Sequence, residues 1–198
     1  MGQSNHNLAS LIGSRICHDL ISPIGAITNG LELLDMAGGM EGPELELISD
    51  SVGNAGARIR FFRIAYGAAG EQMLGRAEVT SVLDDVSRGG RLQLHWSPHE
   101  PQSRACVRLA FLAIQCLETA MPYGGNIVAA VENGRWSVTG TSTKLNVDPD
   151  LWAGLSAPDT LAQVTPAQVQ FALMPTIAQD LARPISTEQA DGHIAIHF

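Results

Sequence analysis

The chain has 198 residues, 45% of them apolar, which is enough to build a core in one ordinary domain or in two small ones. Its formal net charge is −8, with an acidic excess in residues 1–70 and in residues 71–198, so we expect no nucleic-acid partner. No run approaches the roughly 20 apolar residues of a membrane span, and the opening MGQSNHN does not resemble a signal peptide, so we expect a cytoplasmic protein without a membrane partner.

The first predicted element is a long amphipathic helix. From Leu8 to Leu34 the apolar residues recur at steps of four and three, which is the period of one helix face. The glycines of Met36–Gly42 interrupt this pattern and predict a turn. Pro43 then suits the first position of a second helix, where its missing N–H is not needed.

The second predicted helix carries a heptad-like apolar seam from Leu45 to Tyr66. Together the two helices predict an antiparallel hairpin over residues 1–70. A two-helix hairpin buries only one seam, so we expect a homodimer in which two hairpins form a four-helix bundle.

Short mixed elements follow and predict a second domain over residues 76–198, an α/β sandwich, which makes the fold class α+β. The signals are alternating apolar residues, an Asn-Gly turn and a Thr-Pro-Ala-Gln capping box. In chain order we expect a strand at Arg91–Ser97, a helix at Arg104–Ala120, a hairpin of Asn126–Glu132 and Arg135–Thr141, a helix from Thr165 toward Ala182, and a strand at His193–Phe198.

The three cysteines, Cys17, Cys106 and Cys116, lie far apart in the sequence. Their number and spacing support neither a disulfide framework nor a zinc site. We expect them to be small buried side chains, and we expect no metal site.

His18 faces away from the apolar seam of the first helix. It lies two residues from both Ile16 and Leu20, about 200° around a helix of 3.6 residues per turn, so we expect an exposed imidazole. Its neighbours on that face are small or polar and leave room for another protein to approach the ring. We interpret them as a docking face, formed by Ser14, Arg15, Ser22, Gly25 and Asn29.

Pro23 lies inside the same helix, where it removes the hydrogen bond to the carbonyl of Asp19 and costs about 3 kcal/mol. We expect a kink beside His18, and functional sites are places where such local rules are broken. Without further signals, an exposed His next to an Asp is more often a solvated pair than a site.

The segment HDLISPIGAI resembles the H box of sensor histidine kinases. In that box the phospho-accepting His is followed by an acidic residue, a hydrophobe and, five residues on, a proline. His18, Asp19, Leu20 and Pro23 match the pattern. The resemblance implies that His18 accepts a phosphoryl group and that residues 1–70 are a dimerisation and phosphotransfer hairpin, with Pro23 on its partner-binding surface.

Residues 76–198 resemble the ATP-binding sandwich of those kinases in length and element order, but the motifs that bind ATP are degenerate. The helix that should carry magnesium-binding asparagines reads LAFLAIQCLETA, with Gln115 near the key position. The adenine-binding Asp-x-Gly is replaced by TGTSTKLN, and the Gly-rich phosphate lid by TLAQVTPAQVQFALM. We therefore expect that ATP is not bound.

An intact H box joined to a degenerate ATPase-like domain resembles the ChpT-type histidine phosphotransferases of alphaproteobacteria, over nearly the whole chain. The resemblance implies a phosphorelay protein without ATP-dependent kinase activity. Its implied partners are the receiver domain of a hybrid histidine kinase and the receiver domains of response regulators.

The implied mechanism needs no cofactor of the chain's own. The neutral imidazole of His18 attacks the aspartyl phosphate of a docked receiver and later passes the group on. Asp19 orients the ring, Ser22 is placed to bond the phosphate, and magnesium is expected to come with the receiver. Three arginines of the second helix are expected within reach of the phosphate or the receiver, although they also suit solvated charges that match the helix dipole: Arg58, Arg60 and Arg63.

Two rival functions remain. A histidine kinase with a divergent ATP site would be labelled by ATP alone, and the missing lid argues against it. A non-catalytic adaptor would bind receivers without accepting phosphate, and only a phosphate signal that depends on His18 separates it from a phosphotransferase.

Overall fold

The computed structural model describes residues 2–37, 43–68, 70–157 and 164–198. Most of the turn predicted at Met36–Gly42 lies outside these residues. Within the described ranges, no helix combines the length and the apolar character needed to cross a lipid bilayer.

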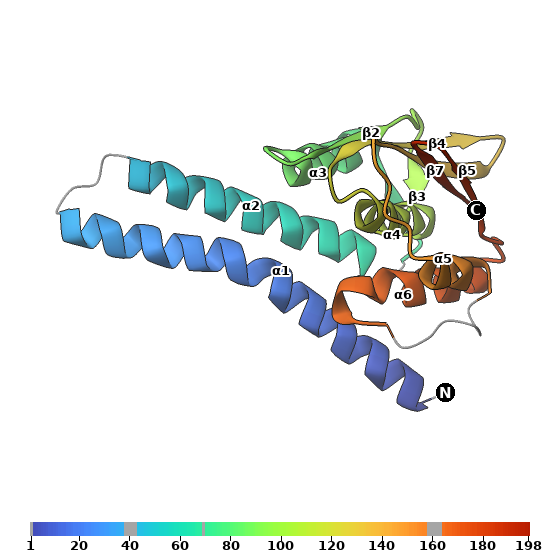
Figure 1. Cartoon of the computed structure of the whole chain (residues 1–198), viewed down its shortest axis with the longest axis horizontal. Coiled ribbons are helices and arrows are strands. Elements are labelled where there is room, and N and C mark those ends of the chain that lie inside the picture. The colour runs from blue at the N-terminus through green and yellow to red at the C-terminus, as the bar shows by residue number, and fades with distance from the viewer. Residues whose placement is uncertain (1, 38–42, 69, 158–163) are drawn as a thin grey trace.

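Two long helices form an antiparallel hairpin that projects from the rest of the molecule (Figure 1). α1 spans Gly2–Ala37 and α2 spans Pro43–Ala65, as the apolar periodicity predicts. A Cβ on Gly30 of α1 would lie 2.6 Å from Cγ1 of Ile48, so the glycine permits the close approach of the two helices.

α1 does not follow α2 along its whole length. It carries Pro23 in its interior, and Figure 1 shows its first half bending away from α2 to run beside the α/β part of the molecule. A proline is an ordinary cause of such a bend, because it removes one backbone hydrogen bond and its ring crowds the preceding turn. The predicted kink beside His18 is confirmed.

The α/β part contains a mixed sheet of five strands in the order β2-β4-β5-β7-β6. β2 pairs with β4 in parallel, and the other neighbours pair antiparallel. The strands are Leu92–Trp96 (β2), Gly125–Glu132 (β4), Arg135–Thr141 (β5), Ser186–Ala190 (β6) and His193–His197 (β7), and a separate pair joins Met73–Leu74 (β1) to Gln102–Ser103 (β3).

Helices α4, α5 and α6 lie together below the sheet in Figure 1, with α6 packed between the other two. α3 packs against α2 and β2. A 3₁₀ turn, η2, precedes α6. The bounds are Arg76–Ser87 (α3), Arg104–Ala120 (α4), Pro149–Ser156 (α5), Pro166–Gln168 (η2) and Val169–Asp180 (α6).

Several predicted elements are confirmed. α4 has the predicted bounds, and the predicted hairpin turns at Asn133 and Gly134, whose φ angles of 50° and 80° suit an Asn-Gly turn. The capping box of Thr165 and Gln168 is present, but it opens into η2 before α6 begins.

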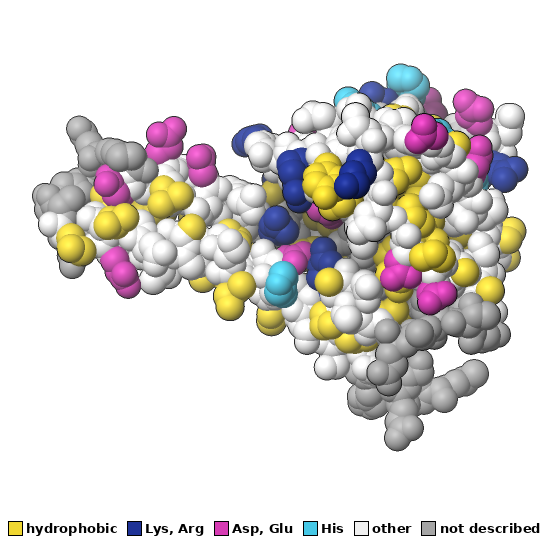
Figure 2. Space-filling view, in the orientation of Figure 1, with side chains coloured by type: hydrophobic (Ala, Val, Ile, Leu, Met, Phe, Trp, Pro, Cys, Tyr) yellow, Lys and Arg dark blue, Asp and Glu magenta, His cyan; other side chains and the backbone are white. Residues whose placement is uncertain are grey.

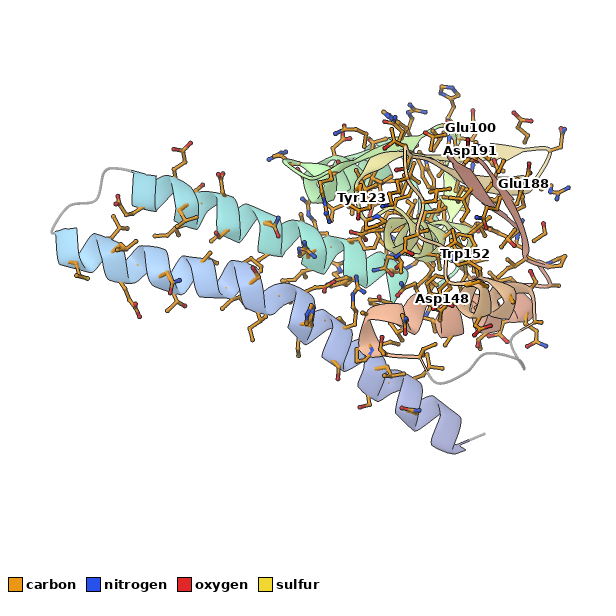
Figure 3. The ribbon with its side chains drawn as sticks, viewed as in Figure 1. Glu100, Tyr123, Asp148, Trp152, Glu188 and Asp191 are labelled. Carbon is orange, nitrogen blue, oxygen red and sulfur yellow. The ribbon has the colours of Figure 1, made fainter. Side chains whose placement is uncertain are left out.

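The sequence did not lead to a prediction of α3, α5, β6 or the short strands β1 and β3. The sequence does contain a start signal for α5, the pair Asp148-Pro149, which suits a helix N-cap and first position. In the structure the carboxylate of Asp148, labelled in Figure 3, accepts the backbone N–H groups of Asp150 and Leu151 at 3.1 and 3.3 Å. β6 is exposed along its whole length and therefore lacks the alternating burial that marks a strand.

The prediction for the cysteines is partly wrong. Cys106 and Cys116 are buried, as expected, and burial raises the pKa of the Cys116 thiol well above its usual range. Cys17 is exposed, because its face of α1 is open to solvent in the single chain.

One apolar core joins the end of the hairpin to the sandwich. Phe61 of α2 is only 5% exposed, and its ring stacks on that of Phe111 in α4 with centroids 4.6 Å apart. α2 is therefore anchored to the helix that forms the centre of the sandwich.

Replacing Phe61 with Ala should lower the free energy of unfolding by about 3–5 kcal/mol, because it leaves a cavity at this junction. Urea unfolding at fixed protein concentration measures the change. Met73→Ala, at a side chain that is 55% exposed, is the control and should have a far smaller effect. Equal losses of unfolding free energy in the two variants would show that the packing of Phe61 does not stabilise the protein beyond an exposed side chain.

Candidate functional site

His18 lies midway along α1, with its side chain 80% exposed, as predicted. Its Nδ1 lies 3.1 Å from Oδ1 of Asp19. A carboxylate only accepts hydrogen bonds, so this contact favours the tautomer that carries the proton on Nδ1. The lone pair is then on Nε2, the other ring nitrogen.

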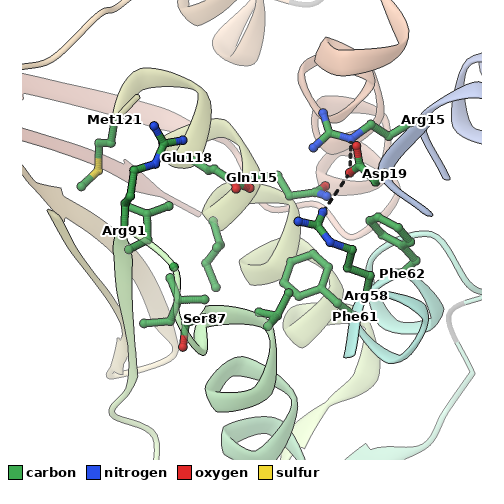
Figure 4. A pocket seen from close by; sticks show the side chains of 15 residues that line it. Arg15, Asp19, Arg58, Phe61, Phe62, Ser87, Arg91, Gln115, Glu118 and Met121 are labelled. Carbon is green, nitrogen blue, oxygen red and sulfur yellow. Dashed lines mark hydrogen bonds and ion pairs between the residues drawn. The ribbon is translucent and has the colours of Figure 1, made fainter. Parts of the chain in front are cut away.

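Asp19 links the exposed histidine to the interior of the site. Its side chain is only 10% exposed, and its second oxygen, Oδ2, accepts a hydrogen bond from Nε of Arg15 at 2.8 Å. Nη1 of Arg58 lies 3.7 Å from the same oxygen (Figure 4). One oxygen thus faces the imidazole while the other faces two guanidinium groups, which holds the carboxylate in place.

Arg15 is not on the docking face, and that part of the prediction is wrong. Its side chain is 15% exposed, and its Nη1 donates to the backbone carbonyl of Ala167 in η2 at 2.7 Å. The bent first half of α1 runs beside η2 and α6, which turns Arg15 inward. The spacing of four residues between Arg15 and Asp19 was the sequence signal for their ion pair.

The rest of the predicted face is mostly open to solvent. Ser14, Ser22 and Asn29 are exposed and Gly25 is half-buried. Pro23 is buried, so its predicted place on the partner-binding surface is wrong. It lies seven residues before Gly30 and therefore on the side of α1 that faces α2.

The three arginines of α2 have different surroundings. Arg58 lies beside Asp19, and its Nε donates to Oδ1 of Asn54 at 3.0 Å. Arg60 forms an ion pair with Asp85 of α3. Arg63 is exposed, and its own backbone carbonyl accepts a hydrogen bond from Arg104. The structure therefore brings Arg58 alone of the three into contact with Asp19.

Comparison with known proteins identifies the family. A family model described as "Histidine phosphotransferase C-terminal domain" matches residues 76–193. The chain is 33% identical over 192 residues to "Protein phosphotransferase ChpT" of Brucella abortus (strain 2308), covering 91% of this chain and 89% of that protein. The chain belongs to the ChpT-type histidine phosphotransferases.

A solved structure agrees with this membership. "1.7 Angstrom Structure of a Bacterial Phosphotransferase" aligns with a TM-score of 0.80 and 31% identity, covering 96% of this chain and 95% of that one. A histidine kinase domain from Erythrobacter litoralis aligns over 98% of this chain and 92% of that one, with a TM-score of 0.45 and 10% identity. The predicted order of a helical hairpin followed by an α/β sandwich is confirmed by the element order, and the chain is a histidine phosphotransferase of two-component phosphorelays.

In this phosphotransferase a cleft of about 210 Å³ opens beside Asp19, between the hairpin and the sandwich. Figure 2 shows basic side chains around a hollow in this region. Dehydration in the cleft raises the pKa of the Glu118 carboxyl, an effect that Arg15 and then Arg58 oppose. The cleft walls include Arg58, Phe61, Arg91, Gln115 and Glu118 (Figure 4).

Gln115, at the place of the expected magnesium-binding asparagine, is engaged within the protein. It is 3% exposed, and its Oε1 accepts a hydrogen bond from the hydroxyl of Tyr66 at 3.0 Å. Burial raises the pKa of Tyr66 to about 12. The carboxamide thus ties α4 to the end of α2, a contact that the sequence analysis missed.

The segment expected to replace the phosphate lid is partly described. From residue 164 onward it forms the capping box, η2 and the start of α6, and residues 158–163 lie outside the described ranges. Over the described residues, no three His, Cys, Asp or Glu side chains are grouped so as to hold a metal ion.

Tyr66→Phe should lower the free energy of unfolding by about 1–3 kcal/mol, because the buried acceptor of Gln115 loses its donor. The matched control is Tyr123→Phe, which removes the same hydroxyl from a tyrosine that is 65% exposed (Figure 3). Chemical unfolding of both variants measures the difference, and equal stability of the two would contradict the role of this hydrogen bond.

Proposed function

We propose that this phosphotransferase carries a phosphoryl group on His18 between receiver domains, from that of a hybrid histidine kinase to those of response regulators. The observation that carries the proposal is an exposed imidazole whose Nδ1 is held by a nearly buried carboxylate. That arrangement points the nucleophilic Nε2 outward, toward a docked partner.

The transfer needs only the two proteins and the receiver's own metal ion. Nε2 of His18 attacks the phosphorus of the receiver's aspartyl phosphate, and the P–O bond breaks so that the receiver's carboxylate leaves with the electron pair. The proton stays on Nδ1, where Asp19 balances the positive charge of the phosphorylated ring. The reverse sequence delivers the group to the next receiver. Magnesium bound by the receiver would offset the phosphate charge.

The surface around His18 suits a protein partner. The exposed Ser14, Ser22 and Asn29, with the small Gly25 among them, leave the ring accessible. Ser22 lies one turn from His18 and is placed to donate to the transferred phosphate. Arg58 contributes positive charge at the edge of this face.

We further propose that ATP is not the donor. The Gln115 carboxamide is buried and bonded to Tyr66, and the described part of the lid segment is a capped helix rather than a glycine-rich loop. Both features favour a sandwich that binds partners and holds the hairpin in place. Both argue against an active kinase with a divergent ATP site. We expect the protein to act in the cytoplasm.

The exposed apolar residues of the hairpin support a homodimer. Two stripes with heptad spacing are open in the single chain, each residue between 47% and 55% exposed: Ile24 and Leu31 on α1, and Leu45, Val52 and Ile59 on α2. Stripes of this kind are usual at helix–helix interfaces, and a four-helix bundle of two hairpins would bury both.

His18→Ala should abolish labelling by a pre-phosphorylated receiver domain, because the substitution removes the imidazole that is proposed as the nucleophile. Phosphotransfer followed by gel autoradiography measures the label, and radiolabelled ATP alone should give none. The control is His95→Ala, at another exposed histidine, which should be labelled like the wild type.

Each of the other outcomes would indicate a different function or a different site. Label that persists in His18→Ala would refute the assignment of the site. Label from ATP alone would make the chain a divergent kinase. Receiver binding without any label would make it an adaptor.

Val52→Glu should convert the homodimer to a monomer, because a charge would be buried in the bundle seam. Size-exclusion chromatography with light scattering measures the mass. Val128→Glu places the same charge at an exposed valine of β4 and should leave the dimer intact. A wild-type chain that is already monomeric would contradict the dimer proposal.

A further inference from the structure

We infer that Arg15 is a positioning residue, through which the α/β sandwich holds Asp19 and thereby His18 in the orientation that transfers phosphate. The inference rests on the proposed role of His18. It assigns a task in the reaction to a side chain that is neither on the docking face nor in contact with the imidazole.

The first step is the pair of hydrogen bonds made by one guanidinium. Nε of Arg15 donates to Oδ2 of Asp19 at 2.8 Å, and Nη1 donates to the carbonyl of Ala167 at 2.7 Å. The two acceptors are 148 positions apart in the sequence, and one of them belongs to the hairpin and the other to η2. With its side chain only 15% exposed, Arg15 bridges the two parts of the molecule.

The second step is that the Ala167 carbonyl is itself fixed. It also accepts a hydrogen bond from Nε2 of Gln170 at 3.1 Å. Gln170 is fully buried, and the same Nε2 lies 3.0 Å from Oγ1 of Thr119 in α4. The carbonyl that receives Arg15 is therefore connected to the central helix of the sandwich rather than to a free loop.

The third step concerns the choice of arginine. The planar fork of a guanidinium donates in two fixed directions at once, whereas the ammonium of a lysine is a compact point charge without that fixed geometry. Arg58 does not replace it, because its Nη1 is 3.7 Å from Asp19 and its Nε is bonded to Asn54. Arg15 thus makes the short contact that fixes the rotamer of Asp19.

The consequence lies in the tautomer of His18. When Oδ2 is held, Oδ1 faces Nδ1 and the proton stays on that nitrogen, so the lone pair of Nε2 is free to attack the receiver's phosphorus. Without Arg15, Asp19 would rotate and the two neutral tautomers of the ring would mix. The maximal rate of transfer would fall, and the affinity for the receiver would not change.

The test is Arg15→Met in single-turnover transfer from a phosphorylated receiver, with the receiver concentration varied. The maximal rate should fall about tenfold or more, the scale on which loss of an orienting hydrogen-bond partner acts. The receiver concentration that gives half the maximal rate should stay the same. Arg135→Met, which removes an exposed guanidinium from β5, is the matched control and should behave as the wild type.

A higher half-saturating concentration with an unchanged maximal rate would make Arg15 a docking residue and overturn the inference. Arg15→Lys, which keeps the positive charge, covers the case in which Arg15→Met does not fold. It should be slower than the wild type at saturating receiver, and a wild-type rate would overturn the inference as well.

A double-mutant cycle with Asp19→Asn gives the sharpest discrimination. If Arg15 acts only through Asp19, Arg15→Met should slow the Asp19→Asn variant no further. Multiplying effects would show that Arg15 acts elsewhere and would contradict the inference. Failure of the proposed function looks different, because the label would then persist in His18→Ala or would be absent from the wild type.

Discussion

The site depends on the two oxygens of the Asp19 carboxylate facing different partners. Oδ1 faces the Nδ1 of His18 at 3.1 Å, and Oδ2 accepts from Arg15 at 2.8 Å. A carboxylate held on one side by a guanidinium loses its freedom to rotate, so its other side becomes a fixed acceptor. An imidazole that is 80% exposed would otherwise sample many orientations. The reacting ring can therefore stand free in solvent, where a partner reaches it, while its orientation is set from the interior.

The α/β sandwich has a structural part in this arrangement. Gln115, at the position expected for a metal-binding asparagine, is buried, and a buried carboxamide is costly unless it is hydrogen-bonded. Tyr66 supplies that hydrogen bond from the end of α2, and Phe61 stacks on Phe111 close by in the same core. These contacts fix the hairpin on the sandwich, which in turn allows the carbonyl of Ala167 to serve as a steady acceptor for Arg15.

Local signals allowed much of the fold to be predicted from the sequence. The periodicity of α1 predicts the exposed His18, and the Asn-Gly pair predicts the turn between β4 and β5. The inward turn of Arg15 was not visible, because it depends on α1 packing beside η2, about 150 residues away. Arg60 was predicted near the phosphate but pairs with Asp85 of α3. This contact was not visible either, because contacts between distant elements leave no local pattern in the sequence. Cys17 was predicted to be buried but is exposed, because its face of α1 is open to solvent in the single chain.

The central claim is that Asp19 holds His18 as the Nδ1–H tautomer and leaves Nε2 to carry the phosphate. Long-range ¹H–¹⁵N correlation spectra of selectively ¹⁵N-histidine-labelled protein, recorded before and after transfer from a phosphorylated receiver, measure both properties of the ring. A proton on Nδ1 in the free protein and phosphate on Nε2 after transfer are the predicted result. Phosphate on Nδ1, or on a residue other than His18, would contradict the claim.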